Sequence, residues 1–592
     1  MRKKRLLRGM AVAAIVLGAG QLLGGQDAKA KEITYNVEKY GVKGDGVEDV
    51  SYSLTKLLKE ADTMSSGDTL VLKFPKGTYK VGSLLRIYSN TTLDLSEGAE
   101  LYRDNPEQPL MMNVGEGGSR KEDDPSGGGY ALSENITITG GVINGGDIEH
   151  AQTGGNVVNF AHAQNITVQD VTFKNCYGAH LLELSGVKDA KVAGCDFSGF
   201  RPEKSSKAED VAGDSSNVNK SGYAAKECIQ LDYTYFDPEK SMLQWCPGYY
   251  SDKTACKDVV IENNTFHDYP RGVGNHHGQE TFANLSTDNI TIRNNTFSNM
   301  YVTAPNGKKV YDYAISLHSF KNAKIEDNII NNAGSAVLCA YDENSTINNN
   351  QMEALDWSAI VLTKHSKGST IKDNTLSDVA RYGISVTNGS NVAAFSENIM
   401  RAGAKKVSML NAITVNGADS YIASVLNNHI SNCSKFGISL LNVKKAGDII
   451  GNDLTSCAKG AICIAGSNCN KVSDNHVVGV AKINSITVCK KSEVRDLSGN
   501  SIEKSGKHAI SISSSKLTNV NGNTIKGSAG NGICSTTATI TNIRYNRIAG
   551  AKKAGIVICK KSSIGNISKN TFSKIKGKKI GVDKTSKVKT KK

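Results

Sequence analysis

Short runs of alternating apolar and polar residues repeat along the chain, and an asparagine marks each repeat. Stretches such as Ile384-Ser385-Val386 place apolar side chains on one face of a short strand and polar ones on the other. Nine of the twelve intervals between marking asparagines are 22–25 residues long. A helical repeat would show a 3.6-residue period instead, so the pattern predicts a β-solenoid. The marking asparagines are Asn264, Asn295, Asn328, Asn350, Asn374, Asn398, Asn428, Asn452, Asn475, Asn500, Asn523, Asn546 and Asn570.

The predicted fold class is all-β: a single right-handed parallel β-helix of about 17 coils, roughly 80 Å long at ~4.8 Å per coil. Equivalent asparagines are expected to stack into a ladder at one turn, because Asn tolerates left-handed backbone and its amide can bond its neighbours. A solenoid must shield its first coil from water. We therefore expect a short N-terminal capping helix at Asp49–Met64, where Leu54, Leu57 and Leu58 have helical spacing.

The N-terminus predicts export. Residues 1–30 combine a basic start, an apolar run from Met10 to Leu23 and the small-x-small sequence Ala28-Lys29-Ala30, which is typical of a cleaved signal peptide. The run is shorter than a membrane span, and no later segment is apolar enough for one. We expect a secreted or cell-surface protein cleaved near Ala30, with decorated coils at 31–350, regular coils at 351–580 and a lysine-rich tail at 581–592.

Charge and cysteine content add two expectations. The net charge is +14, and nine lysines between Lys574 and Lys592 suggest contact with an anionic cell wall. No nucleic-acid-binding motif accompanies these lysines, so nucleic acid is disfavoured as a partner. We expect the protein to be a monomer.

Of the 13 cysteines, Cys246 and Cys256 form the one plausible local bridge. Three others share an offset after a marking asparagine and are expected at one interior position: Cys339, Cys463 and Cys534.

Two stretches near the start of the mature chain resemble a known family. Tyr35–Gly46 and Phe74–Tyr79 resemble the opening of the pectin-lyase-like β-helix superfamily, which includes polygalacturonases and pectate-lyase-like proteins. The resemblance covers about residues 33 to 580 as a fold. It implies a right-handed β-helix and a polysaccharide ligand, while the opening motif says little about chemistry.

The coils between Asn165 and Asn328 carry long insertions and many ionisable residues, whereas later coils are plain. The insertion Tyr233–Lys257 holds Trp245 and Tyr249, whose rings suit stacking on sugars. Aligning apolar positions gives the register Leu182/Leu184, Ile229/Leu231, Val273/Asn275 and Ile315/Leu317. Alternation then places Glu183, Gln230, Asp232, His276, Ser316 and His318 on one solvent-facing sheet, and the bends before the strands hold His180, Glu227, Arg271 and Tyr313. Plain coils have serine in the same slot as Glu183, at Ser385, Ser439 and Ser511.

This cluster predicts a glycoside hydrolase acting on an acidic, uronate-containing glycan. Such enzymes use two carboxyl groups, ~6.5–9.5 Å apart when they invert configuration. Glu183 and Asp232 lie on adjacent coils with a two-residue offset, which corresponds to about 8 Å. The predicted catalytic residues are Glu227, Asp232, Glu183 and His180. The predicted substrate-binding residues are Arg271, His276, His318, Tyr313, Gln230, Trp245 and Tyr249.

Four positions of this register correspond to motif positions of the polygalacturonases that the chain resembles. Glu227 stands where that family has the second acid of its Asp-Asp pair, and it alone keeps the same kind of charge. His180 replaces the acid of the Asn-Thr-Asp motif, Arg271 the histidine of Gly-His-Gly, and His318 the lysine of Arg-Ile-Lys. The resemblance therefore implies the location of a site but not pectin specificity.

Two alternatives remain open from the sequence. A polysaccharide lyase or epimerase would use Arg271 or His276 as base, with Glu183 and Asp232 on Ca²⁺; otherwise no cofactor or metal is expected. A non-catalytic cell-surface glycan-binding adhesin is the other alternative. The long plain C-terminal half favours it, because catalysis does not need those coils.

Overall fold

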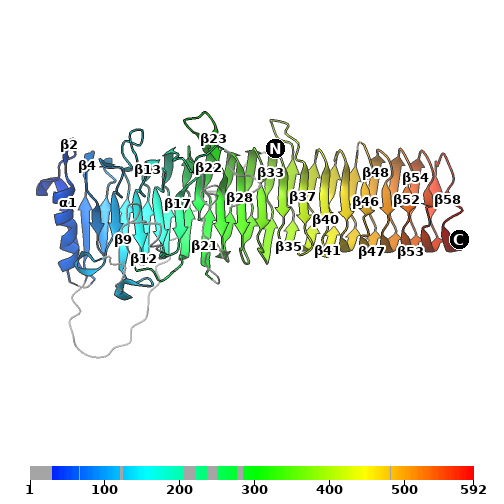
Figure 1. Ribbon diagram of the computed structural model, residues 1–592, viewed down its shortest axis with the longest axis horizontal. Coiled ribbons are helices and arrows are strands. Elements are labelled where there is room, and N and C mark those ends of the chain that lie inside the picture. Colours follow the sequence, from blue (N-terminus) through cyan, green and yellow to red (C-terminus); the bar gives the residue numbers. More distant parts are fainter. Residues whose placement is uncertain are drawn as a thin grey trace, which may run out of the picture.

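The computed structural model describes residues 30–592 apart from 66, 120–124, 206–220, 236–249, 276–284 and 481. The chain forms a rod in which each coil adds one strand to each of three parallel sheets (Figure 1). The first sheet runs from β1 (Glu32–Asn36) to β59 (Lys587–Lys591), and the second from β2 (Asp45–Asp49) to β57 (Thr571–Ser573). The third sheet runs from β5 (Leu85–Ile87) to β58 (Ile580–Val582). The prediction of an all-β parallel β-helix is confirmed.

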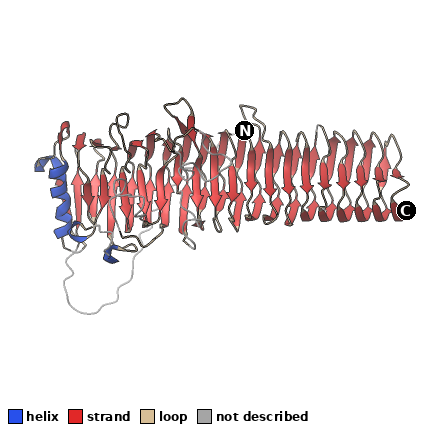
Figure 2. Ribbon diagram, viewed as in Figure 1, coloured by secondary structure: helices blue, strands red, loops and turns tan. Residues whose placement is uncertain are grey.

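A helix covers the first coil, as predicted. α1 (Ser51–Leu58) continues into the 3-10 helix η2 (Lys59–Thr63), and both lie across the N-terminal end of the rod (Figure 2). Leu54, Leu57 and Leu58 are buried beneath it. In the described part of the chain, no helix is both long enough and apolar enough to cross a membrane. The predicted signal peptide lies outside the described residues.

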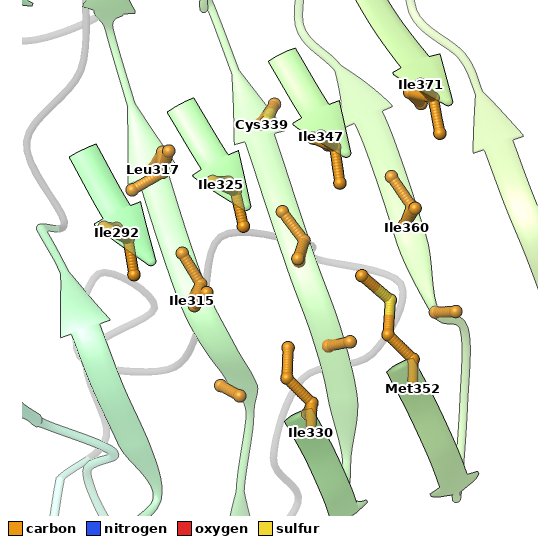
Figure 3. Packing of buried hydrophobic residues seen from close by; sticks show 14 of the residues in the cluster. Ile292, Ile315, Leu317, Ile325, Ile330, Cys339, Ile347, Met352, Ile360 and Ile371 are labelled. Carbon is orange, nitrogen blue, oxygen red and sulfur yellow. The ribbon is translucent and has the colours of Figure 1, made fainter. Parts of the chain in front are cut away.

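The core is a stack of inward-facing apolar side chains contributed by successive coils. In Figure 3, Ile315 and Leu317 of one coil lie beside Cys339 and Ile360 of the next two, in matching positions. Aromatic residues stack in the same way on the second sheet, where Phe173, Phe197, Phe266 and Phe297 have ring centroids 4.8, 5.1 and 4.7 Å apart. Because each strand is paired on both sides with the same register, apolar positions stay aligned along the rod.

The asparagine ladder is confirmed, and its geometry corrects one detail. The backbone N–H of Asn452 donates to Oδ1 of Asn475 at 3.0 Å, and its Nδ2 donates to the same oxygen at 2.9 Å. Such bonds join every marking asparagine from Asn264 to Asn570. The residue with left-handed backbone is the one before each marker, for example Asn427 at φ 53°. The marker's amide, rather than its backbone freedom, therefore explains the asparagine.

The number of coils was underestimated. The first sheet has 21 strands, of which β25 (Phe320–Lys321) and β26 (Lys324–Glu326) both pair with β21 (Thr287–Arg293) and share one coil, so it has 20 coils rather than roughly 17. The early coils have other residues in the ladder position. In the coil before Asn264 this residue is Cys195, whose backbone N–H donates to Oδ1 of Asn264 at 2.9 Å. Without the marker these coils cannot be counted from the sequence.

The shared interior position predicted for three cysteines is wrong for two of them. Cys339 pairs with Leu317 and Leu362 and lies in the core. Cys463 pairs with Ser439 and Thr487, so it belongs to the outward row of the third sheet, and Cys534 lies in that same row opposite Ser511. Cys256 is a buried free thiol, and its proposed partner Cys246 lies outside the described residues. The lysine-rich C-terminal end forms β59, which pairs with β56 (Ser563–Ser568).

Candidate functional site

The candidate site lies on five strands of the third sheet. They are β11 (Val158–Ala161), β14 (Leu182–Ser185), β17 (Glu227–Asp232), β20 (Arg271–Gly274) and β24 (Tyr313–His318). The predicted register is confirmed: Leu182 pairs with Ile229, Ile229 with Val273, and Val273 with Ile315. Asp232 stands opposite Ser185, two positions from Glu183, as expected.

The outward face of these strands is covered, which corrects the prediction of a solvent-facing sheet. Glu183 is 6% exposed and Asp232 8%, and Gln230, Ser316 and His318 are also buried. Alternation along a strand tells which face a side chain lies on but not how far its neighbours bury it, and the same row is also buried in plain coils, as Ser439 shows. His276, Trp245 and Tyr249 lie outside the described residues.

Glu227 and Arg271 form the centre of a buried ionic network. Nη1 of Arg271 donates to Oε1 of Glu227 at 2.7 Å, and its Nε donates to Asp312. Glu227 is fully buried and Arg271 is 1% exposed. Burial opposes ionisation of Glu227, but Arg271, His180 and Lys226 outweigh it and hold its pKa below the usual value. Glu227 thus links β17 to β20 through its ion pair with Arg271.

Asp312 and His180 complete this network, and at both of them burial outweighs the attraction of neighbouring charges. Burial raises the pKa of Asp312 to about 6, although the positive charge of Arg271 favours the ionised form. Burial also lowers the pKa of His180 to about 4, against the pull of Glu227, so its imidazole is neutral at pH 7. Nδ1 of His180 lies 2.9 Å from the carbonyl oxygen of Glu227. The network thus combines one guanidinium with two carboxyl groups of very different acidity.

Glu183 and Asp232 also bond to the protein. Glu183 accepts hydrogen bonds from Asn156 Nδ2 and, at 2.6 Å, from Ser185 Oγ. Asp232 accepts the backbone N–H of Tyr233 at 2.7 Å and Gln230 Nε2 at 3.2 Å. In the described residues no three His, Cys, Asp or Glu side chains are grouped to hold a metal. Each oxygen of Glu183 accepts one of these bonds and keeps a further lone pair, so Ca²⁺ binding by this pair, as in the lyase alternative, stays a prediction.

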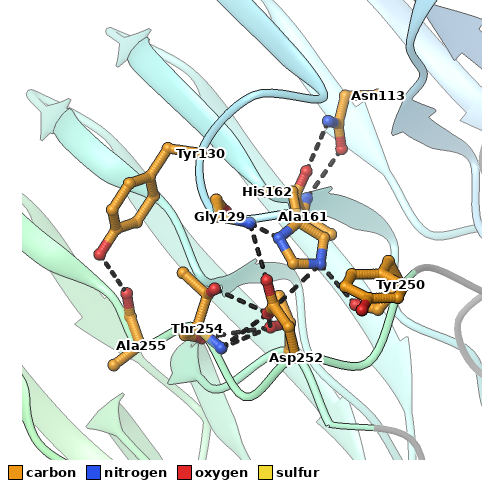
Figure 4. Close-up of polar contacts among 10 residues, drawn as sticks. Asn113, Gly129, Tyr130, Ala161, His162, Tyr250, Asp252, Thr254 and Ala255 are labelled. Carbon is orange, nitrogen blue, oxygen red and sulfur yellow. Dashed lines mark hydrogen bonds and ion pairs between the residues drawn. The ribbon is translucent and has the colours of Figure 1, made fainter. Parts of the chain in front are cut away.

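A polar clamp holds the insertion that follows Asp232. His162, at the end of β11, has Nδ1 2.7 Å from the Gly129 carbonyl oxygen and Nε2 2.6 Å from that of Tyr250 (Figure 4). Asp252 accepts Gly129 N–H at 2.8 Å and Thr234 Oγ1 at 2.7 Å. Segments more than 100 residues apart are thereby tied together beside the end of β11.

Sequence reasoning missed Asp312, Asn156, His162 and Asp252. Asp312 stands directly before Tyr313, one place before the aligned bend position, so extending the alignment by one residue would have found it. His162 and Asp252 had no such signal, because their partners are mainly backbone groups of distant loops.

Three family models match successive parts of the chain. Residues 34–175 match a model described as rhamnogalacturonase A/epimerase, pectate lyase-like, residues 248–400 a right-handed beta helix region, and residues 403–579 a periplasmic copper-binding protein, NosD. The chain is a right-handed, pectate-lyase-like parallel β-helix. Each model spans less than half of the chain, so together they identify the fold.

Similar proteins include one curated relative and several solved structures. Plasmin and fibronectin-binding protein A of Streptococcus pneumoniae is 24% identical over 338 residues, which are 53% of this chain and 43% of that protein. The alignment thus spans less than half the length of that relative. The S. pneumoniae surface protein and adhesin PfbA has a TM-score of 0.41 at 16% identity, covering 94% of this chain and 100% of the other. A Thermotoga maritima exopolygalacturonase has a TM-score of 0.36 at 13% identity, covering 79% and 90%.

Proposed function

We propose that this protein is a non-catalytic, cell-surface glycan-binding adhesin. The observation that carries the proposal is the state of Glu227, the strongest catalytic candidate of the sequence. It is fully buried and ion-paired to Arg271 at 2.7 Å. A general acid or base must come within hydrogen-bond reach of the substrate, and burial and ion pairing disfavour that role for Glu227. The similarity to a streptococcal protein named for binding plasmin and fibronectin also supports a binding role.

The glycan would bind over the clamped part of the third sheet. Tyr130, Tyr235 and Tyr250 lie there half-buried, and Lys253 Nζ is 5.8 Å from the Tyr235 ring centroid. Partly exposed rings beside a cation suit a sugar ring that carries a carboxylate. In this proposal His180, Glu183 and Asp232 shape the polar floor. Gln230, Tyr313, His318, Arg271, His276, Trp245 and Tyr249 are its further proposed contacts or supports.

One specific observation favours glycoside hydrolysis as the second candidate function. Glu183 and Asp232 keep the two-residue offset on paired strands, corresponding to about 8 Å, within the ~6.5–9.5 Å gap of inverting enzymes. Both are slightly exposed, unlike Glu227. If catalysis occurs, this pair carries it and Glu227 supports the strands.

A glycan panel separates the two candidates. Mature protein is incubated with acidic and neutral polysaccharides, and retention, new reducing ends and ultraviolet absorbance of unsaturated uronate are followed. We expect retention of an acidic glycan without either product. Reducing ends that disappear in Glu183→Gln and Asp232→Asn would establish the hydrolase instead, and absorbance would establish a lyase. Retention of plasmin or fibronectin but of no glycan would contradict glycan binding.

A further inference from the structure

One edge of the rod, between the second and third sheets, carries a column of lysines through the C-terminal coils. Backbone hydrogen bonds place these turns directly over one another: Lys459 N–H donates to the Lys435 carbonyl oxygen at 2.8 Å, and Lys553 N–H to that of Gly530 at 3.0 Å. We call this surface the basic edge. Eight of its exposed lysines are Lys435, Lys459, Lys482, Lys507, Lys552, Lys553, Lys576 and Lys578.

The basic edge has no compensating acids. The turn segments 432–437, 456–461, 480–486, 505–510, 528–533, 551–556 and 574–580 contain no Asp or Glu. Among the described residues none of the eight lysines has a carboxylate within 4.0 Å, whereas lysines on the sheets do: Lys516 pairs with Glu493 at 2.9 Å and Lys526 with Glu503 at 3.1 Å. Burial together with Lys507 and Lys553 lowers the pKa of His508, on the same edge, to about 4. The positive potential of these lysines is therefore concentrated on the basic edge and is not reduced by nearby carboxylates.

The same column begins with an aromatic platform. Lys435 N–H donates to the Leu410 carbonyl oxygen, Leu410 N–H to that of Arg381 and Arg381 N–H to that of Trp357, at 2.9, 2.7 and 2.9 Å. The Arg381 guanidinium lies 5.4 Å from the ring centroids of both Trp357 and Tyr382. These rings are half-buried. A platform that offers ring faces and a guanidinium can stack a sugar and pair its acid group at once.

We propose that the basic edge and its aromatic platform form a binding surface for a linear anionic polysaccharide lying along the rod. The column spans ten turns from Trp357 to Gly577, or roughly 43 Å at ~4.8 Å per coil. A polymer with regularly spaced acid groups meets a regularly spaced row of cations, and many weak contacts add up to affinity. The aromatic platform selects sugar rings. This surface lies outside the clamped site of the decorated coils, so the inference does not rest on the proposed function.

The test compares two four-lysine variants with equal loss of charge. The first replaces Lys435, Lys459, Lys507 and Lys553 with serine. The matched control replaces four ion-paired lysines, Lys372, Lys444, Lys516 and Lys526, with serine. Binding of polygalacturonate, heparin, neutral dextran and single-stranded DNA is measured by calorimetry at several salt concentrations, after thermal melting has shown that both variants fold.

We expect wild type to bind polygalacturonate and heparin but not dextran, with affinity falling as salt rises. The first variant should lose at least tenfold in affinity and part of its salt dependence, and the control less than twofold. Trp357→Ala should lose severalfold with an unchanged salt dependence. Equal losses in both four-lysine variants, or no binding by wild type, would overturn the proposal, as would DNA binding that exceeds polysaccharide binding and ignores Trp357→Ala. Both four-lysine variants keep every residue of the clamped site, so a loss confined to the first variant concerns the basic edge alone.

Discussion

The decorated coils and the plain coils share one scaffold but place charge differently. In the outward row of the third sheet, Glu183 and Gln230 occupy the positions that Ser385 and Ser439 occupy later. The decorated coils bury ion-paired charged groups, as Arg271 shows at 1% exposure. The plain coils carry exposed charges, for example along the basic edge, and their buried Asp378 is held by backbone N–H groups. What distinguishes the decorated coils is therefore the buried ion network in which Arg271 joins Glu227 and Asp312.

This contrast also separates two sources of stability. Plain coils depend on apolar stacking and on the uncharged asparagine ladder, which repeats from coil to coil. The decorated coils add an ion network whose desolvation cost is offset only while every partner is present. Repeat proteins stabilise each coil mainly through its neighbours. Damage to the network is thus expected to weaken the decorated coils first.

The largest effect is expected for Arg271→Ala. The substitution leaves Glu227 and Asp312 buried without their shared cation, which costs about 3–5 kcal/mol in comparable cases. Urea denaturation measures the loss, and hydrogen exchange of β17, β20 and β24 locates it. Arg293→Ala is the control, because Arg293 pairs with Glu262 but its side chain is 46% exposed, and about 1 kcal/mol or less is expected. Equal losses in both variants would remove the distinction between covered and exposed charge.

The second effect concerns pH. The pKa of Asp312 is raised from 3.8 to about 6, so the folded protein binds this proton more tightly than the unfolded chain. Its contribution to stability is complete below pH 4 and is lost as the pH rises through 6, by about 3 kcal/mol at most. Asp312→Asn removes this dependence, so the stability difference between wild type and variant should fall between pH 4 and 7. Urea titrations at each pH measure it, and a constant difference would contradict the raised pKa.

Much of the fold could be predicted because it repeats. The strand parity around Ile384 and Ile438 and the spacing of the asparagines recur often enough to define the coil. Apolar stacking is a local, periodic requirement and therefore appears in the sequence. The first coils escaped the count because Cys195 replaces the marker. The outward positions of Cys463 and Cys534 were missed because cysteine suits either face of a strand.

A third expectation tests the ladder itself. Asn452→Ala removes the acceptor for Asn428, whose backbone N–H and Nδ2 lie 3.0 and 2.9 Å away, and the donor to the Val425 carbonyl oxygen. Buried groups left without partners cost about 1–3 kcal/mol, so a loss of roughly 2 kcal/mol is expected by urea denaturation. Asn542→Ala is the control, since its half-buried side chain makes one bond, to Asn519 at 3.0 Å. A control loss as large as the first would show that burial in the ladder adds nothing.

The candidate site was predicted only in part, for a physical reason. Register follows from strand parity, so the positions of Glu183, Asp232 and Arg271 relative to one another were correct. Exposure depends on which loops fold back over the sheet. The contacts of His162 with Gly129 and Tyr250 join segments 33 and 88 residues away. Their backbone carbonyl partners leave no residue pattern, so the sequence could not predict where these loops lie.

The smallest effect is expected for His162→Asn, and it is local. His162 has left-handed backbone at φ 50°, which Asn tolerates, so the substitution removes the clamp without backbone strain. Loss of its contacts with Gly129 and Tyr250 should speed hydrogen exchange at 250–255 about tenfold, ~1.4 kcal/mol, with global stability unchanged. His365→Asn is the matched control, because His365 has φ 64° but is exposed on a plain coil. If 250–255 exchange at the wild-type rate in His162→Asn, the cover is held by its other contacts, and Asp252→Asn becomes the substitution that should release it.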